Sequence, residues 1–176
     1  MIRELWYTFA VCHSFRFYGA VCHDLEEKRM GEKKAPVTNP VLKETISRLH
    51  KGEHAREHQM VTLHILLQAQ LLAPVSITPG RTNTQIQFQL ITTPDGRAFF
   101  PAFTDLEELK KGFSGADQQT VILPFADYAR MILRDKAAQG LVVNPFGDSL
   151  TLEQPLVEFL ERVRLDEQPS KPPIQS

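Results

Sequence analysis

The chain has 176 residues, a formal net charge of −1 and a hydrophobic fraction of 42%. A chain of this length buries about two-thirds of its unfolded surface, which is enough for one core without disulfide or metal staples. Its near-neutral charge argues against a nucleic-acid-binding protein, which needs a basic stripe to attract phosphates, and no apolar run reaches the length of a membrane span. We therefore expect one domain that has neither nucleic acid nor a membrane as a partner.

The first 29 residues differ in composition from the rest of the chain. They contain both cysteines, Cys12 and Cys22, and the only tryptophan. Two cysteines are too few for a disulfide framework, and the segment lacks the basic start of a secretion signal, so we expect a cytoplasmic protein. Residues 26–29, Glu-Glu-Lys-Arg, can be encoded entirely by purines, as a bacterial ribosome-binding site is, and Met30 follows at once. We predict that translation starts at Met30 and that residues 1–29 are a leader without a selected fold.

Two helices are predicted before the first strand. Asn39 is a residue type preferred at helix N-caps, and Pro40 is preferred at the first helical position. Apolar residues then recur at helical spacing until Gly52 ends the turn. A second helix is predicted from about residue 53 to residue 69. The side chains expected to face inward from it include Met60, Leu63 and Leu67.

Three strands are predicted next. Residues 72–77 form an apolar run in which Pro74 marks a sheet edge or a strand start. Residues 86–90 alternate strictly between apolar and polar side chains, which indicates a half-buried strand. A Pro-Asp-Gly turn at residues 94–96 is typical of a hairpin, so residues 97–103 are predicted to pair with 86–90.

The rest of the chain is predicted to alternate between helices and strands. Continuously apolar strands, as expected where both faces are covered, are joined by helical crossovers that favour parallel, right-handed connections. A last strand and a last helix, opened by Pro155, follow. The fold class is therefore a mixture of α+β and α/β: one domain whose mixed sheet has an antiparallel hairpin and a short parallel βαβαβ run, with helices packed on it. The predicted helices are 105–111 and 125–138, and the predicted strands are 121–123, 141–143 and 150–152.

A capping box is predicted where the first of these crossover helices begins. Thr104 is followed three residues later by Glu107. In such a box the threonine hydroxyl accepts a hydrogen bond from the backbone N–H of the glutamate, whose side chain reaches back. We expect Thr104 to be the N-cap.

Four blocks of the sequence resemble the SseB-type (enhanced serine sensitivity) N-terminal domain. The longest is residues 94–109, Pro-Asp-Gly-Arg-Ala-Phe-Phe-Pro-Ala-Phe-Thr-Asp-Leu-Glu-Glu-Leu. The others are Asn-Pro-Val-Leu at 39–42, Val-Ile-Leu-Pro-Phe at 121–125 and Gly-Leu-Val-Val-Asn-Pro-Phe-Gly at 140–147. The blocks occur in the family's order, and the resemblance extends from about residue 39 to residue 163.

The resemblance implies a fold but no reaction. The family has no established biochemical activity or site residues, and its domain is often joined to a further C-terminal domain, with a loose link to serine sensitivity. Only a short tail follows Val163 here, so we expect a stand-alone module. Its function is expected to be non-catalytic binding of a protein partner or a small ligand, with no cofactor. The expected organisation is a leader at 1–29, a flexible N-terminus at 30–38, the domain at 39–165 and a disordered tail at 166–176.

An alternative function is a small zinc-dependent hydrolase. The string His54-Ala55-Arg56-Glu57-His58 matches His-x-x-Glu-His, in which two histidines one helical turn apart bind zinc and the glutamate activates water. The string lies at the polar start of the second helix, where nothing shields a metal from water. A solvated helix start explains the same residues. His64, among leucines and an isoleucine, is predicted to be a half-buried helix residue.

The predicted binding site lies where three strands end in related residues. The carboxyl ends of parallel strands meet at one edge of a sheet, where open α/β sheets usually bind ligands. Phenylalanines gathered there would form an apolar anchor. The alternative is that each phenylalanine turns inward and fixes a helix on the sheet. The predicted site residues are Phe103, Phe125, Asn144, Pro145 and Phe146.

Overall fold

The computed structural model describes residues 36–52, 55–79, 85–115, 118–134 and 138–167. The proposed leader, Met30 and His54 lie outside these residues. The described residues contain both helices and strands, as the mixed fold class requires. The elements in chain order are α2 (Pro40–His50), α3 (Arg56–Gln68), β1 (Gln70–Thr78), β2 (Gln85–Phe88), β3 (Ile91–Thr92), β4 (Ala98–Ala102), α4 (Leu106–Lys110), β5 (Gln119–Pro124), α5 (Phe125–Arg134), β6 (Gly140–Val143), β7 (Leu150–Glu153) and α6 (Gln154–Glu167).

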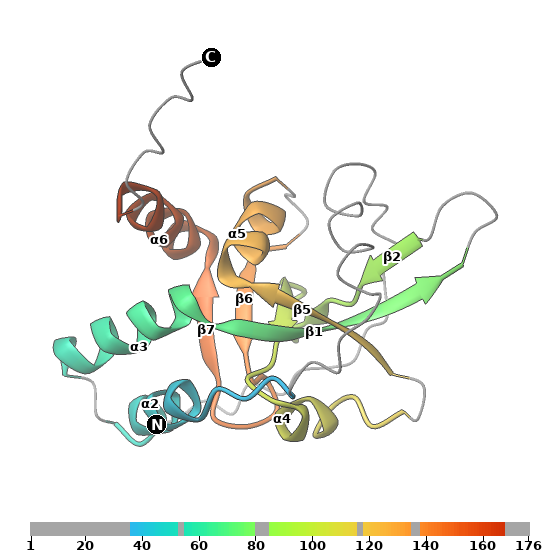
Figure 1. Cartoon of the computed structure of the whole chain (residues 1–176), viewed down its shortest axis with the longest axis horizontal. Coiled ribbons are helices and arrows are strands. Elements are labelled where there is room, and N and C mark those ends of the chain that lie inside the picture. Colours follow the sequence, from blue (N-terminus) through green and yellow to red (C-terminus); the bar gives the residue numbers. More distant parts are fainter. Residues whose placement is uncertain (1–35, 53–54, 80–84, 116–117, 135–137, 168–176) are drawn as a thin grey trace, which may run out of the picture.

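The strands form two sheets that β1 brings together. One sheet is antiparallel, in the order β2-β1-β5, and the other is mixed, in the order β3-β4-β6-β7. The backbones of Leu72 in β1 and Phe103 after β4 exchange two hydrogen bonds of 2.9 Å, and this isolated bridge joins the two sheets. Figure 1 shows β1 running across the molecule in front of β6 and β7. Helices α5 and α6 pack together, α3 contacts both α2 and α5, and α4 lies against β1.

The structure confirms a mixed fold with helices packed on the sheets, but it corrects two predicted strand pairings. Residues 86–90 were predicted to pair with 97–103, whereas β2 pairs with β1 and only Ile91 and Thr92 pair with β4. The Pro-Asp-Gly turn does close this shorter hairpin, with the Thr93 N–H donating to the Arg97 carbonyl at 2.9 Å. The second correction is that β5 pairs antiparallel with β1, and β4 and β6 are the only parallel neighbours among the strands that the structure describes. Side-chain periodicity reports how many faces of a strand are covered, and it does not report which strand lies beside it.

Buried side chains form a large and a small apolar cluster. The large cluster lies among α2, α3, α5, α6 and both sheets, and Phe125, Tyr128 and Leu141 are fully buried in it. The small cluster is centred on the ends of β4 and α4. Its buried members are Leu72, Ile91, Phe99, Phe103, Leu109, Phe113 and Val142.

Helix α3 begins at Arg56, three residues later than predicted, and two of the side chains predicted to face inward, Leu63 and Leu67, pack against the large cluster. Thr62 and Leu66 are its buried residues, whereas Met60, predicted to face inward, is 57% exposed. The Thr62 hydroxyl donates to the His58 carbonyl at 2.8 Å, so its polar group is satisfied within the helix and the side chain can be buried. The apolar pattern therefore finds most of the buried face and is wrong at Met60.

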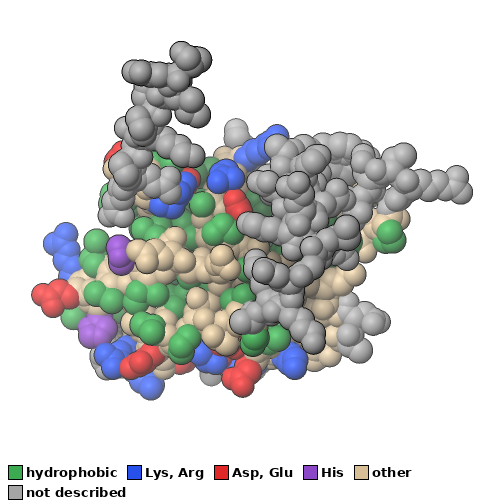
Figure 2. Space-filling model, viewed as in Figure 1, with side chains coloured by type: hydrophobic (Ala, Val, Ile, Leu, Met, Phe, Trp, Pro, Cys, Tyr) green, Lys and Arg blue, Asp and Glu red, His purple; other side chains and the backbone are tan. Residues whose placement is uncertain are grey.

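Some apolar side chains remain on the surface of the helices. Figure 2 shows hydrophobic groups among polar ones on the side of the molecule that carries α2 and α3, where Val41, Met60 and Val61 are exposed. His64 is also exposed rather than half-buried, and its ring lies 3.2 Å from the Gln68 amide nitrogen. At the other end of the chain, α6 runs to Glu167, two residues beyond residue 165, the predicted end of the domain.

Candidate functional site

The parallel pair β4 and β6 ends at one edge of the mixed sheet, and two predicted site regions meet there. Phe103 follows β4, and the turn Asn144–Gly147 follows β6. Phe125 does not join them, because β5 belongs to the other sheet and the Phe125 side chain is buried in the large cluster. The expectation that all three strand ends share one edge is therefore wrong for β5.

Three phenylalanine rings contact one another at this edge. Phe103 is fully buried, and Phe146 is half-buried with its ring stacked on Phe103 at a centroid distance of 6.3 Å. Phe113, which the sequence did not single out, meets both rings edge-on at 5.6 and 5.9 Å. A Cβ atom at Gly112 would lie 1.9 Å from the Phe146 ring, so this position requires glycine for the rings to approach. The contacts with Phe103, Phe113 and Gly112 therefore fix the position of the Phe146 ring.

Asn144 fixes the turn Asn144–Gly147 through hydrogen bonds. Its backbone is in the left-handed region at φ 51°, which asparagine tolerates better than most residues. Its buried side chain accepts a hydrogen bond from the Thr104 N–H at 3.0 Å and donates one to the Thr104 hydroxyl at 3.0 Å. Its backbone N–H donates to the Ala102 carbonyl at 2.9 Å, and its carbonyl accepts from Gly147 at 3.1 Å. Pro145, the next residue, is buried.

The N-cap of α4 is Asp105 and not Thr104. The Asp105 carboxylate accepts a hydrogen bond from the Glu108 N–H at 2.9 Å. The Thr104 hydroxyl is already engaged by Asn144, and it also contacts the Asp105 carboxylate at 3.0 Å. The sequence was ambiguous at this point, because Glu107 and Glu108 each stand three residues after a residue that can cap a helix.

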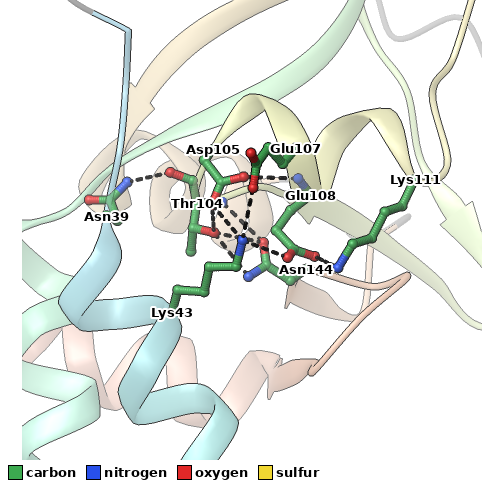
Figure 3. Close-up of polar contacts among 8 residues, drawn as sticks. All are labelled: Asn39, Lys43, Thr104, Asp105, Glu107, Glu108, Lys111 and Asn144. Carbon is green, nitrogen blue, oxygen red and sulfur yellow. Dashed lines mark hydrogen bonds and ion pairs between the residues drawn. The ribbon is translucent and has the colours of Figure 1, made fainter.

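Lys43 of α2 reaches into the acidic start of α4, as Figure 3 shows. Its ammonium group lies 2.9 Å from Glu108, 3.2 Å from Asp105 and 3.7 Å from Glu107. The second oxygen of Glu108, whose side chain is only 5% exposed, contacts the Lys111 ammonium at 2.6 Å. The buried carboxylate is thus held between two lysines. The hydrogen bond to Glu108 is the main reason why the pKa of Lys43 is raised, with a further contribution from Asp105.

The cap also sets the charge of Asp105. Burial alone raises the pKa of this carboxyl group, but hydrogen bonds from the Glu108 N–H, Lys43 and Thr104 together bring the pKa below its ordinary value. Asp105 is therefore ionised near neutral pH and acts as a hydrogen-bond acceptor. A carboxylate whose pKa is lowered is poorly suited to general acid–base work at that pH.

Asn39 ties this region to the start of the domain. It precedes α2, but its side chain does not cap that helix. The Asn39 amide instead donates to the carbonyls of Gln70 at 2.9 Å and Thr104 at 2.8 Å. No local pattern in the sequence reveals these contacts, which join segments 31 and 65 residues apart.

The residues of the zinc alternative are only partly visible in the structure. Glu57 and His58 lie in the first turn of α3, where Glu57 is exposed and the His58 ring lies 3.5 Å from the Arg48 guanidinium. The segments that the structure describes contain no group of three histidine, cysteine, aspartate or glutamate side chains placed to hold a metal ion. They also contain no helix that is both long and apolar enough to cross a bilayer.

Comparison with known proteins identifies the family. The family model described as the SseB protein N-terminal domain matches residues 42–158. No curated protein and no solved structure matches the chain. The matched range includes the start of α4 and the turn Asn144–Gly147, two segments that build this edge. The chain therefore belongs to the family of the SseB protein N-terminal domain.

Proposed function

We propose that the chain is a non-catalytic cytoplasmic module that binds a protein partner at the edge formed by the ends of β4 and β6. The observation that carries this proposal is the fixed turn Asn144–Gly147. Asn144 is held by Thr104, and Phe146 is stacked on Phe103, so the turn is anchored from two sides. A surface that is rigid before binding loses less conformational entropy when a partner docks.

The composition of the edge supports a protein partner. Phe146 is half-buried beside the exposed Gly147 and Asp148. The Glu107 side chain, 88% exposed, lies in the first turn of α4, where it shares Lys43 with Asp105. An aromatic side chain surrounded by polar groups is the usual composition of the centre of an interface. Phe103 and Asn144 position Phe146 in this proposal, and the buried Phe125 makes no direct contact with a partner.

Site-specific photo-crosslinking tests the proposal. A photoreactive phenylalanine analogue placed at Asp148 should capture a partner in cells, whereas the same analogue at Glu158 on α6, 58% exposed, should not. The captured protein is then purified and its affinity for the wild-type chain measured. Phe146→Ser should weaken binding by about tenfold or more, the loss of an interface hot spot.

A second variant separates binding from folding. Phe146→Ser also removes packing from the small cluster, so its thermal unfolding must be measured in parallel. Glu107→Lys changes a side chain that is 88% exposed, and it should alter affinity while leaving stability nearly unchanged. Equal crosslinking at Glu158, or unchanged affinity in both variants, contradicts the proposal.

The zinc hydrolase has its own test. Elemental analysis of the purified chain should find no stoichiometric zinc. Stoichiometric zinc that is lost when His54 and His58 are both replaced would favour the hydrolase and contradict a purely binding role.

A further inference from the structure

A pocket of about 380 Å³ opens beside α5, away from the edge described above. Its apolar walls are Phe88 from β2, Leu123 from β5, and Met131 and Leu133 from α5. Three charged side chains of α5 complete the lining: Asp127, Arg130 and Arg134. The volume lies within the range of roughly 300 to 1,000 Å³ that is usual for small-molecule sites.

The pocket results from how α5 is patterned. Phe125, Tyr128, Ala129 and Ile132 are buried beneath the helix. Residues 127, 130, 131 and 134 are spaced three or four apart, so they form a neighbouring stripe on the same helix. One member of that stripe, Met131, is buried and the others are charged. The stripe therefore provides both an apolar wall and a charged rim.

The charge at the rim favours an anionic group. Two guanidinium groups and one carboxylate line the pocket. Arg130 contacts Asp127 at 3.0 Å through one nitrogen, and the Arg130 side chain is 63% exposed. An ion pair this exposed contributes little stability, so exchanging its carboxylate for that of a ligand costs little. The planar guanidinium also matches a carboxylate with two parallel hydrogen bonds.

We propose that this pocket binds a small amphipathic carboxylate. The apolar part of the ligand fills the space between Phe88, Leu123 and Met131, and its carboxylate contacts Arg130 and Arg134. This site goes beyond the proposed function, because it lies on different elements from the turn Asn144–Gly147 and takes a ligand of a different class.

Octanoate is the probe, and octanol is its uncharged counterpart. Isothermal titration calorimetry with the full chain should show binding of octanoate, and octanol should bind at least about tenfold more weakly. A hydrogen bond to a charged group contributes about 1.5 to 3 kcal/mol, and 1.4 kcal/mol corresponds to a factor of ten. Amide resonances of α5 and of the ends of β2 and β5 should shift on titration, and those of the turn Asn144–Gly147 should not.

Variants locate the two parts of the ligand. The double variant Arg130→Gln with Arg134→Gln should lower the affinity for octanoate by about tenfold or more and leave that for octanol unchanged. Arg162→Gln is the matched control, because Arg162 is 69% exposed on α6 and pairs with Glu158 at 3.3 Å. Leu133→Trp, at a half-buried position of the wall, should weaken both ligands by filling the pocket. Circular dichroism and thermal unfolding confirm that each variant is folded.

Three results would overturn the proposal: no binding of octanoate below its micellar range, equal binding of octanol and octanoate, or unchanged affinity in the double variant. Resonance shifts confined to other parts of the chain would do the same. None of these results bears on partner binding at the β4–β6 edge, which Phe146→Ser and Glu107→Lys address, so the two proposals fail independently.

Discussion

The two apolar clusters of this domain are held together in different ways. The large cluster is formed by helices and both sheets, and apolar packing dominates it. The small cluster, at the ends of β4 and α4, adjoins a polar network. In this network Asn144 contacts Thr104, Thr104 contacts Asp105, and Asp105 contacts Lys43. The large cluster therefore stabilises the domain mainly by burying apolar side chains. The hydrogen bonds beside the small cluster instead fix the positions of the turn Asn144–Gly147 and of the start of α4. Substitutions in the two regions are expected to have different consequences.

The largest loss of stability is expected in the large cluster. Phe125→Ala removes a fully buried ring and should lower the free energy of unfolding by about 3 to 5 kcal/mol. The turn Asn144–Gly147 should keep its conformation, because Thr104 and the small cluster hold it. Chemical denaturation measures the loss. A loss below about 1 kcal/mol would show that the ring is not packed as described.

Asn144→Ala tests the geometry of the edge. It leaves the buried Thr104 N–H without its acceptor and places alanine at a positive φ, so the expected loss is about 2 to 4 kcal/mol. Asn144→Gly also loses the hydrogen bonds but tolerates the backbone, and it should be less destabilising by about 1 kcal/mol. Equal stability of the two variants would contradict the assigned backbone conformation.

Gly112→Ala tests the close approach of the Phe146 ring. The added methyl group overlaps the ring, which must move, and the cost of such overpacking is about 1 to 3 kcal/mol. Gly115→Ala is the matched control, since its Cβ would meet nothing within 4 Å. Thermal unfolding gives the stability, and the aromatic proton resonances of Phe146 report the displacement. Similar behaviour of the two alanine variants would refute the contact.

Asp105→Ala removes the N-cap of α4, and the expected loss is about 1 kcal/mol. Glu107→Ala changes an exposed side chain in the same turn and should cost much less. If Thr104 were the cap instead, Glu107 would occupy the third helical position and Asp105→Ala would not remove a capping bond. Chemical denaturation of both variants distinguishes the two arrangements.

A smaller effect is expected from pH. The pKa of Asp105 is lower in the folded state than its ordinary value of 3.8. Its contribution to stability is therefore complete above that value and is lost as the pH falls through the lower, folded pKa. The wild-type chain should lose more stability than Asp105→Asn over this acid range. Parallel acid-denaturation curves of the two proteins would contradict the sign of the shift.

The sequence predicted local features of both regions well, and it predicted long-range contacts poorly. The helix that begins at Pro40 and the apolar strands at β5 and β6 follow from periodicity and composition, which are local properties. The pairing of β5 with β1 depends on a partner about fifty residues away, for which strand patterns carry no signal. The same limit applies to the candidate site. Phe103, Asn144 and Phe146 were singled out as strand ends, whereas Lys43 and Phe113 enter the site only through tertiary contacts.

The order of the strands determines how the domain folds and where its chain can be divided. Neither sheet is contiguous in the chain, because β5 of one sheet falls between β4 and β6 of the other. A break anywhere between β4 and β5 would leave each fragment with part of both sheets and all of neither. The domain cannot be divided into two smaller folding units, and its two sheets should form in a single cooperative step. Gene fusion or truncation must therefore keep the residues from α2 to α6 in one chain, because helices at both ends also contribute buried residues to the large cluster.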